Sequence, residues 1–351
     1  MEQLKRDTTL DIAKAVCIIL MVIGHAGCPK YMCDVVYLFH MPCFFFISGL
    51  LFNEKYYANL SSGIKKKLRS YYVPFVKWEL LFLLFHNAFA TLHIYDSNFT
   101  LSQFVECFVR IVTMTGGERL LGGFWFLISM TWAALIAVAF CYMLSKYNKL
   151  TNISISGGVI FLLLVAFLED YLPFKIPSQF GPQTLLATAV FMTGYMFKRL
   201  DILGKMSITH KTLMLSVPLI VAIFTSLSIT SSQGIQVVLC YLIALTGIIG
   251  VLGISAYLSD KSISKVFTYI GDKTLYILVF HFLAFKIVSY VYIILTGRSI
   301  EDLERFPGVV NPPSYLWIIY AIFGIAFSLA VWEIVDKVQK RFAKTQEPKR
   351  N

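Results

Sequence analysis

The chain has 351 residues, of which 57% are hydrophobic and only 15% are charged, and its mean hydropathy is +0.70. This composition excludes a water-soluble globular protein, because a chain of this length cannot bury so much apolar surface, and it predicts an all-α polytopic membrane protein. The formal net charge of +11 does not indicate a nucleic-acid partner, because the Lys and Arg residues lie in short clusters between apolar runs, as membrane topology requires.

Ten apolar runs are each long enough to cross about 30 Å of hydrocarbon, which takes about 20 residues in a helix. They cover residues 10–28, 34–52, 73–92, 123–145, 153–172, 181–198, 212–230, 235–258, 270–295 and 314–335. A cytoplasmic N-terminus puts most Lys and Arg residues on the cytoplasmic side, and those that would face outward are Lys30, Arg110, Arg119, Lys175, Arg298 and Arg305. This bias predicts ten transmembrane helices with both termini cytoplasmic. We expect one membrane domain over residues 1–336 and a basic cytoplasmic tail over residues 337–351.

The seven cysteines lie mostly within these apolar runs. They show neither the CxxC nor the Cys/His spacing of metal sites, so we expect no metal ion. We interpret them as packing residues, with a disulfide between Cys28 and Cys33 as the alternative for that pair.

The first apolar run, residues 10–28, carries Asp11, Lys14 and His25. Charge inside lipid is costly, so ionisable residues there indicate function. In a helix Lys14 and His25 lie within about 20° of each other and roughly 16 Å apart along the axis, and Asp11 can pair with Lys14 at i, i+3. We expect a polar line that ends in a side chain able to exchange a proton near neutral pH. The alternative role for His25 is a hydrogen bond to a neighbouring helix, and the run is too long and too polar for a removable signal.

The second run, residues 34–52, contains Pro42, which removes a backbone donor and predicts a kink or a helix start there. His40 lies toward the outer end of this run, where an interfacial position is a more ordinary interpretation than a catalytic one. The aromatic residues Phe44–Phe46 are typical of a lipid-facing surface.

A dense basic stretch, residues 65–69, lies between the second and third runs. One interpretation is a topology determinant that contacts anionic lipid headgroups. The other is a phosphate clamp in which Lys66, Lys67 and Arg69 hold the phosphates of a cytosolic, nucleotide-bearing donor.

Two long connections lie on the predicted outer side, at residues 93–122 and 296–313. The first contains an amphipathic stretch, Phe99–Met114, that lies on the membrane surface or re-enters the membrane. Loops of this length often cover a site.

The later runs contain three further candidates. Trp125 follows a pair of glycines that permit close approach, although a Trp at this depth is also a common interfacial anchor. The ninth run contains Tyr276 and His281, and the alternative role for His281 is packing or a hydrogen bond. The spacing of four other ionisable residues at membrane depth assigns them no role: Glu79, His86, Lys286 and Glu333.

Together these features resemble the membrane-bound acyltransferase family 3, and within it the fucose 4-O-acetylase-like branch. The resemblance covers nearly the whole chain and rests on residues 11–14 with Gly24-His25, residues 39–49, Lys66-x-x-Arg69, Trp125-Phe126-Leu127 and residues 271–281. The chain departs from the family pattern at two positions. Lys14 stands where the family has an Arg, and Lys66 stands where an Arg-x-x-Arg motif often begins. Each lysine keeps the positive charge but lacks the planar guanidinium group, which can form two parallel hydrogen bonds to one partner.

The resemblance implies a membrane-bound O-acyltransferase of the bacterial cytoplasmic (inner) membrane. It would move an acyl group, usually acetyl but also succinyl, from cytosolic acyl-CoA to a hydroxyl of a sugar or of an envelope polysaccharide such as an exopolysaccharide. Its expected partners are the glycan acceptor, acetyl-CoA or another acyl-CoA as co-substrate, membrane lipids and envelope-biosynthesis proteins, without nucleic acid or metal.

Residue by residue, the resemblance implies three groups of site residues. The catalytic group is His25, Lys14 and Asp11; the donor-binding group is Lys66, Arg69 and Lys67; the acceptor-binding group is Trp125, Tyr276 and His281. His25 would act as a general base on the sugar hydroxyl or as a nucleophile that forms a transient acyl-imidazole.

Two other classes of protein compete with this interpretation. A transporter or flippase of a glycan or lipid-linked sugar also lines its path with intramembrane charges, but the sequence shows no inverted pair of Gly/Pro-interrupted spans. A scaffold for envelope assembly leaves the polar face of the first run unexplained.

Overall fold

The computed structural model describes residues 7–173 and 176–346, and every regular element in these residues is a helix. The α-helices are α1 (Thr8–His25), α2 (Lys30–Leu50), α3 (Leu60–Lys67), α4 (Val73–Leu84), α5 (His86–Thr91), α6 (Leu101–Val112), α7 (Trp125–Lys146), α8 (Asn152–Leu168), α9 (Pro182–Leu200), α10 (Ile202–Lys205), α11 (Ile208–Leu213), α12 (Ser216–Val221), α13 (Ile235–Ser259), α14 (Ser264–Asp272), α15 (Thr274–Thr296) and α16 (Leu316–Gln346). Short 3₁₀ segments are η1 (Glu54–Tyr56), η3 (Arg119–Phe124), η4 (Glu169–Tyr171), η5 (Ser178–Phe180) and η6 (Ile300–Glu304), and η2 (Leu68–Tyr72) is a π-helical turn.

The helices confirm a multi-pass membrane protein, but they do not confirm ten spans. Six helical stretches in the described residues are long and apolar enough to cross a membrane: Thr8–His25, Lys30–Leu50, Arg119–Lys146, Ile235–Ser259, Thr274–Thr296 and Leu316–Arg341. The other four predicted runs are helical yet fall short, because two are divided (α4 with α5, and α11 with α12), α8 has 17 residues, and α9 is less apolar. The second division has a clear cause, since Pro218 cannot donate to the carbonyl of Met214.

Helix α9 lies at the centre of the bundle, against α2, α7 and α8. Its residues from Thr184 to Tyr195 are buried without interruption. A Cβ on Gly194 would lie 2.2 Å from the carbonyl oxygen of Phe46, and one on Gly49 would lie 1.9 Å from that of Phe191. The backbones of α2 and α9 therefore touch, which only glycine permits.

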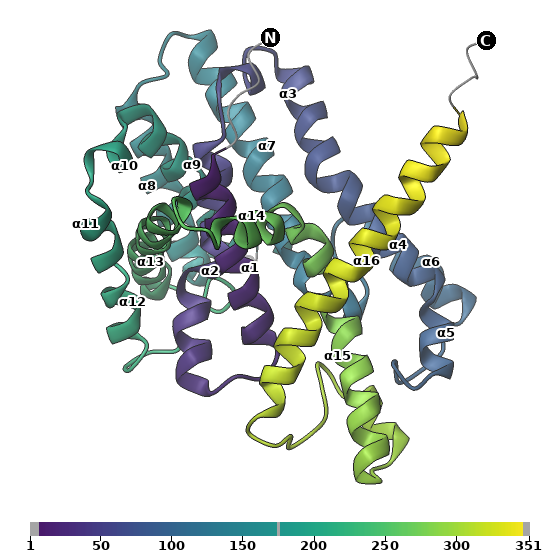
Figure 1. Ribbon diagram of the computed structural model, residues 1–351. Helices are drawn as coiled ribbons and strands as arrows, with labels where there is room; N and C mark the ends of the chain where they lie inside the picture. The colour runs from purple at the N-terminus through teal and green to yellow at the C-terminus, as the bar shows by residue number, and fades with distance from the viewer. Residues whose placement is uncertain (1–6, 174–175, 347–351) are drawn as a thin grey trace, which may run out of the picture.

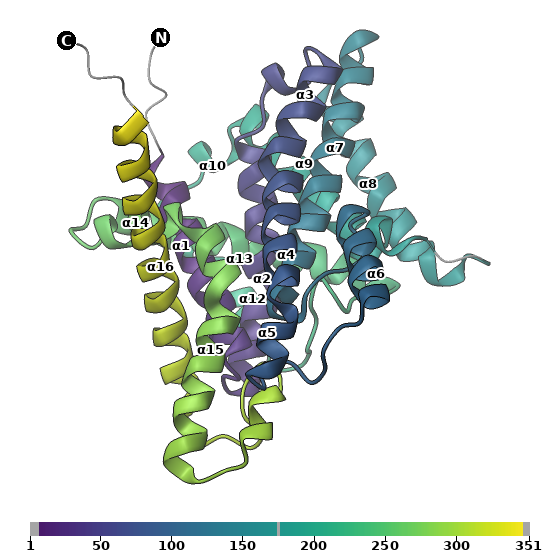
Figure 2. The ribbon, with the colours of Figure 1, turned by 90° about the vertical axis from the view of Figure 1, so that its right-hand side faces the viewer.

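Both ends of the described chain lie on the same side of the bundle (Figures 1 and 2). Helix α1 begins and α16 ends there, whereas the α1–α2 turn and the α15–α16 connection lie on the opposite side. We call these the terminal side and the loop side. Helix α16 extends to Gln346 and so includes much of the predicted tail, whose residues 347–351 lie outside the described part.

The amphipathic stretch forms α6, which packs along α4 (Figure 2). The Tyr72 hydroxyl, at the start of α4, donates to the carbonyl of Val112 over 3.0 Å. This hydrogen bond holds the end of α6 against the start of α4. Helix α2 continues through Pro42 and begins at Lys30, so the helix does not start at the proline.

Candidate active site

His25 is the last residue of α1, where it meets His281 of α15. The Nδ1 atom of His281 lies 3.0 Å from the carbonyl oxygens of both Ile277 and Leu278, so it must carry the proton and donate. In a neutral ring the Nε2 of His281 is then an acceptor, and it lies 2.9 Å from Nδ1 of His25. His25 therefore donates from Nδ1 and keeps an unprotonated Nε2, which is the atom that a base or nucleophile needs.

The ring of His25 is held by packing as well. It stacks on Phe282, with ring centroids 4.9 Å apart and planes 19° from parallel. A Cβ on Gly123 would lie 2.9 Å from Leu278 and about 4 Å from both histidine rings. Gly123 thus lets the chain pass close over the histidine pair, as the glycine pair before Trp125 predicts, whereas a Cβ on Gly122 would meet only ordinary contacts.

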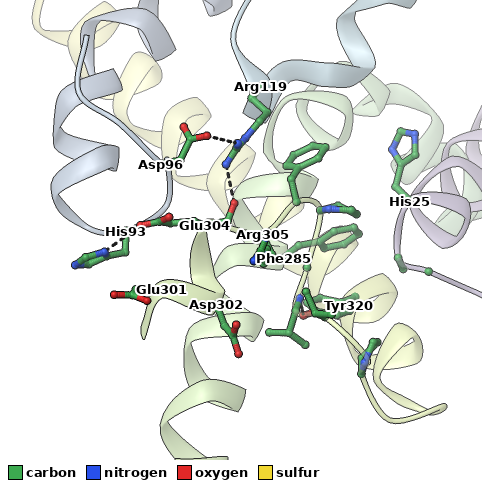
Figure 3. A pocket seen from close by; sticks show the side chains of 18 of the residues that line it. His25, His93, Asp96, Arg119, Phe285, Glu301, Asp302, Glu304, Arg305 and Tyr320 are labelled. Carbon is green, nitrogen blue, oxygen red and sulfur yellow. Dashed lines mark hydrogen bonds and ion pairs between the residues drawn. The ribbon is translucent and has the colours of Figure 1, made fainter. Parts of the chain in front are cut away.

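A large polar cavity, which we call the loop cavity, opens beside His25 on the loop side (Figure 3). Its volume is about 950 Å³. Both predicted long connections contribute to its walls, with His93, Asp96 and Arg119 from the first and residues 299–310 from the second. Phe285 and Tyr320 add aromatic surface. Such a mixture of charged, hydroxyl and aromatic groups suits a polyhydroxylated ligand.

The two connections are tied to each other around this cavity (Figure 3). Arg119 donates to the carbonyl of Glu304 over 2.7 Å and lies 3.4 Å from the Asp96 carboxylate. His93 contacts the Glu304 carboxylate at 3.3 Å. The buried ammonium group of Lys286, on α15, donates to the carbonyl of Leu303 in the second connection over 2.6 Å. The loop cavity therefore has fixed walls.

A second cavity, the histidine cavity, lies on the other side of His25. It measures about 250 Å³ and is lined by His25, Trp125 and His40 together with Tyr37, Met41, Leu278 and residues 228–230. His40 is buried there and donates from Nδ1 to the carbonyl of Val36 over 2.7 Å. His40 is therefore not at the outer end of its helix as expected, because α2 begins ten residues earlier, at Lys30, and His40 lies midway along it.

A third cavity, the apolar cavity, continues toward the terminal side. It measures about 230 Å³, and its lining is mostly apolar. It shares Met41 and Leu278 with the histidine cavity, and it ends at Lys14. Ser70 and Tyr71, from the π turn η2, also line it. A π turn inside a helix often marks a functional site, and here it brings these side chains to the cavity.

Lys14 also lines a fourth space, the terminal cavity, of about 900 Å³ on the terminal side. Its ammonium group lies 2.6 Å from the carboxylate of Asp11, as the i, i+3 spacing predicts. The polar line from Asp11 through Lys14 to His25 thus runs beside four cavities in series.

The three residues of the predicted phosphate clamp are not brought together. Lys67 is buried, with its ammonium group 4.0 Å from the ring centroid of Tyr56. Lys66 is exposed, and Arg69 lines a lateral groove formed by α3, η2 and the start of α4. This groove shares no lining residue with the four cavities that follow α1.

The three predicted acceptor-side residues divide between two places. Trp125 lines the histidine cavity, and His281 supports His25 through their hydrogen bond. Tyr276 instead packs edge-on against Trp78 of α4, with ring centroids 5.7 Å apart. Tyr276 lines none of the four cavities.

Ionisable residues that lacked a role in the sequence hold connections in place. His86 contacts the Glu118 carboxylate at 3.0 Å, and the backbone amide of Glu118 donates to Glu79 over 2.7 Å. This buried cluster fixes the segment that leads to Arg119. Near the terminal side, Glu333 accepts a hydrogen bond from Tyr269, which joins α16 to α14.

The alternative disulfide does not form in the structure. Cys28 and Cys33 are both free thiols, and the Cys33 sulfur lies 3.3 Å from the carbonyl oxygen of Cys28. The hydrogen bond with the neighbouring thiol of Cys33, followed by burial, raises the pKa of Cys28. Within the described residues, no group of three or more His, Cys, Asp or Glu side chains could hold a metal ion.

Comparison with known proteins identifies the family of the chain. Residues 7–333 match the family model described as an acyltransferase domain, acyltransferase 3. A curated relative, the nodulation protein NolL of Mesorhizobium japonicum, is 25% identical over 167 residues, which cover 44% of this chain and 40% of NolL. The match thus spans less than half of that protein, and no solved structure gave a significant match. The chain belongs to the acyltransferase 3 family.

Proposed function

We propose that the chain is an O-acyltransferase that moves an acyl group, in the first instance acetyl, from cytosolic acyl-CoA to a hydroxyl of a sugar or envelope polysaccharide. One observation carries the proposal: His25, with an unprotonated Nε2, borders both the wide loop cavity and the histidine cavity, and the histidine cavity shares Met41 and Leu278 with the apolar cavity. The family membership supports acyl transfer in general. The fucose 4-O-acetylase-like branch, the bacterial inner membrane and a cytoplasmic terminal side are further parts of the proposal.

The two kinds of cavity suit the two substrates. The apolar cavity and the histidine cavity are narrow, so they fit the extended thioester arm of an acyl-CoA better than a glycan. The loop cavity is wide and polar, so it fits a sugar. Transfer at His25 requires only the acyl group to pass between them. A flippase would instead need a polar path wide enough for the whole sugar.

The chemistry follows from the tautomer of His25. Its Nε2 removes the proton of the acceptor hydroxyl while that oxygen attacks the thioester carbonyl, and the C–S bond then breaks. The imidazolium returns the proton to the leaving thiolate. Alternatively, Nε2 attacks the thioester first and the C–S bond breaks to release the CoA thiolate; the hydroxyl oxygen then takes the acyl group from the imidazole while its proton passes to the thiolate. The hydrogen bond from Nδ1 to His281 keeps Nε2 available in both routes.

The proposal is tested by donor binding and by product analysis. Purified protein should bind radiolabelled acetyl-CoA, and excess unlabelled CoA should displace it. Envelope glycans from cells that express the protein should gain acetyl groups by mass spectrometry relative to cells that lack it. Absence of both results would contradict acyl transfer and return the chain to the transporter class.

A further inference from the structure

The walls of the terminal cavity contain lysines from four different elements. Lys14 comes from α1, Lys55 from η1, Lys198 from α9 and Lys211 from α11. These elements are far apart in sequence, so no local motif brings the four cations together. The remaining walls include four carboxylates, of Asp7, Asp11, Asp201 and Asp272. Whether the cavity can hold an anion therefore depends on which charges are already paired.

Three of the four carboxylates are engaged by groups within three residues of them in the sequence, and the fourth, that of Asp201, lies against Gly204. Asp7 caps the N-terminus of α1 by accepting from the amide of Thr9 over 2.9 Å. Asp11 pairs with Lys14 at 2.6 Å, and Asp272 pairs with its neighbour Lys273 at 2.7 Å.

The other three lysines are held differently. Lys198 donates to the carbonyl of Phe52 over 2.8 Å, and Lys211 donates to the carbonyl of Leu203 over 3.2 Å. Lys55 is exposed, with its ammonium group 5.2 Å from the ring centroid of Tyr56. Among the described residues, none of these three lysines forms a direct ion pair with a carboxylate, so each ammonium group can still bind an anion in the cavity.

A fifth lysine increases this local charge. Lys67 is buried among aromatic rings, of which Tyr56 also lines the terminal cavity. Burial, together with the charge of Lys55, lowers the pKa of Lys67 to about 8. The two ammonium groups are thus close enough to repel each other. A bound polyanion would relieve this repulsion.

We propose that Lys55, Lys198 and Lys211 bind the phosphate groups of the donor nucleotide in the terminal cavity. This inference rests on the proposed function and gives its donor a binding site. From that site the thioester arm reaches Lys14, which lines both the terminal and the apolar cavity, and continues toward His25. The site differs from the basic stretch at residues 65–69, whose Lys66 and Arg69 do not line this cavity.

The inference is tested by comparing two donors that differ in their phosphates. The double variant Lys55→Gln/Lys211→Gln should raise the KM for acetyl-CoA at least tenfold, because charge-assisted contacts to phosphate are lost. Its KM for acetyl-pantetheine, which lacks the nucleotide, should be unchanged. Adenosine 3′,5′-bisphosphate should compete with acetyl-CoA in the wild type and more weakly in the variant. Lys198→Arg keeps the charge and should retain the wild-type KM, whereas Lys198→Gln should not.

The matched control is the double variant Lys146→Gln/Lys149→Gln, which also removes two exposed cations from the terminal side, at the end of α7, and touches no residue of the cavity lining. We expect it to keep the wild-type KM for acetyl-CoA. An unchanged KM in Lys55→Gln/Lys211→Gln, with normal wild-type turnover, would overturn the phosphate site and leave the proposed function standing. Absence of turnover in the wild type would instead count against the proposed function.

Anionic lipid headgroups offer the same phosphate chemistry, so the assays are run in nanodiscs of phosphatidylcholine with and without phosphatidylglycerol. A nucleotide site predicts the same KM difference between wild type and variant in both membranes. If the difference appears only when phosphatidylglycerol is present, the three lysines bind lipid and the inference is wrong.

Discussion

At the scale of single residues, the hydrogen bond between His25 and His281 determines what His25 can do. The two carbonyl groups of α15 orient the proton on His281, and His281 in turn orients the proton on His25. A base held by a second group in this way is a recurring arrangement in acyl-transfer enzymes. In the proposed reaction His281 is therefore a positioning residue, which need not contact either substrate.

This role predicts a specific pattern for variants of His281. His281→Ala should lower kcat roughly tenfold to hundredfold, because His25 loses its preferred tautomer and orientation, while the KM for acetyl-CoA stays unchanged. His281→Gln offers a carbonyl oxygen as acceptor and should recover part of kcat. Steady-state kinetics on both variants, at matched thermal stability, measure the difference. Equal losses of kcat in the two variants would mean that His281 contributes packing and not a hydrogen bond.

Part of the site could be predicted from the sequence. Asp11, Lys14 and His25 lie on one helix, so their relation follows from helical geometry, and their contacts agree with it. His281 supports His25 from a helix more than 250 positions away, and no spacing encodes that contact. Likewise, only the packing of elements that are distant in sequence brings Lys55, Lys198 and Lys211 to the terminal cavity.

At the scale of elements, the helices form where the hydropathy pattern predicts them, except where contacts with neighbouring helices change the surroundings of the side chains. Hydropathy is least decisive for α9, which we predict as a span although its threonines make it less apolar than the six spanning helices. In the structure two of these hydroxyls bond to other helices, Thr184 to Ser129 over 3.1 Å and Thr193 to Tyr241 over 2.7 Å. The hydropathy pattern fails where the chain breaks, as at Phe85 between α4 and α5 and near Pro218. The mean hydropathy of a stretch of sequence shows neither the hydrogen-bond partners of buried hydroxyl groups nor the positions where a helix breaks.

The two connections around the loop cavity act as one element because Arg119 joins them. Arg119→Ala should lower acyl transfer to the glycan at least tenfold, since the walls of the loop cavity separate, while binding of radiolabelled acetyl-CoA stays unchanged. Arg298→Ala is the matched control, because Arg298 donates within the second connection and does not line the cavity. Equal effects of the two substitutions on transfer would rule out a specific role for Arg119.

At the scale of the whole molecule, the four cavities give the protein a direction. The donor would enter on the terminal side and the acceptor on the loop side, with His25 between them. This account needs the two sides to face different compartments. Both ends of the described chain lie on one side, in agreement with the charge bias of the sequence (Figure 2).

Sidedness is measured by labelling single cysteines in a background without the native thiols. In intact cells a membrane-impermeant maleimide should label Glu301→Cys, which lies at the loop cavity. It should label Lys65→Cys, near the terminal side, only after the cells are permeabilised. Labelling of both positions in intact cells would place the two cavities on the same side of the membrane and refute the proposed direction.

The central claim is that the Nε2 atom of His25 passes the acyl group from donor to acceptor. The most direct test is acetyl transfer from radiolabelled acetyl-CoA to envelope glycan by purified His25→Ala protein, with His210→Ala, an exposed histidine on α11, as control. We predict that His25→Ala loses at least 10²-fold in kcat, keeps acetyl-CoA binding and folds normally, while His210→Ala matches the wild type. Wild-type turnover by folded His25→Ala protein would contradict the account.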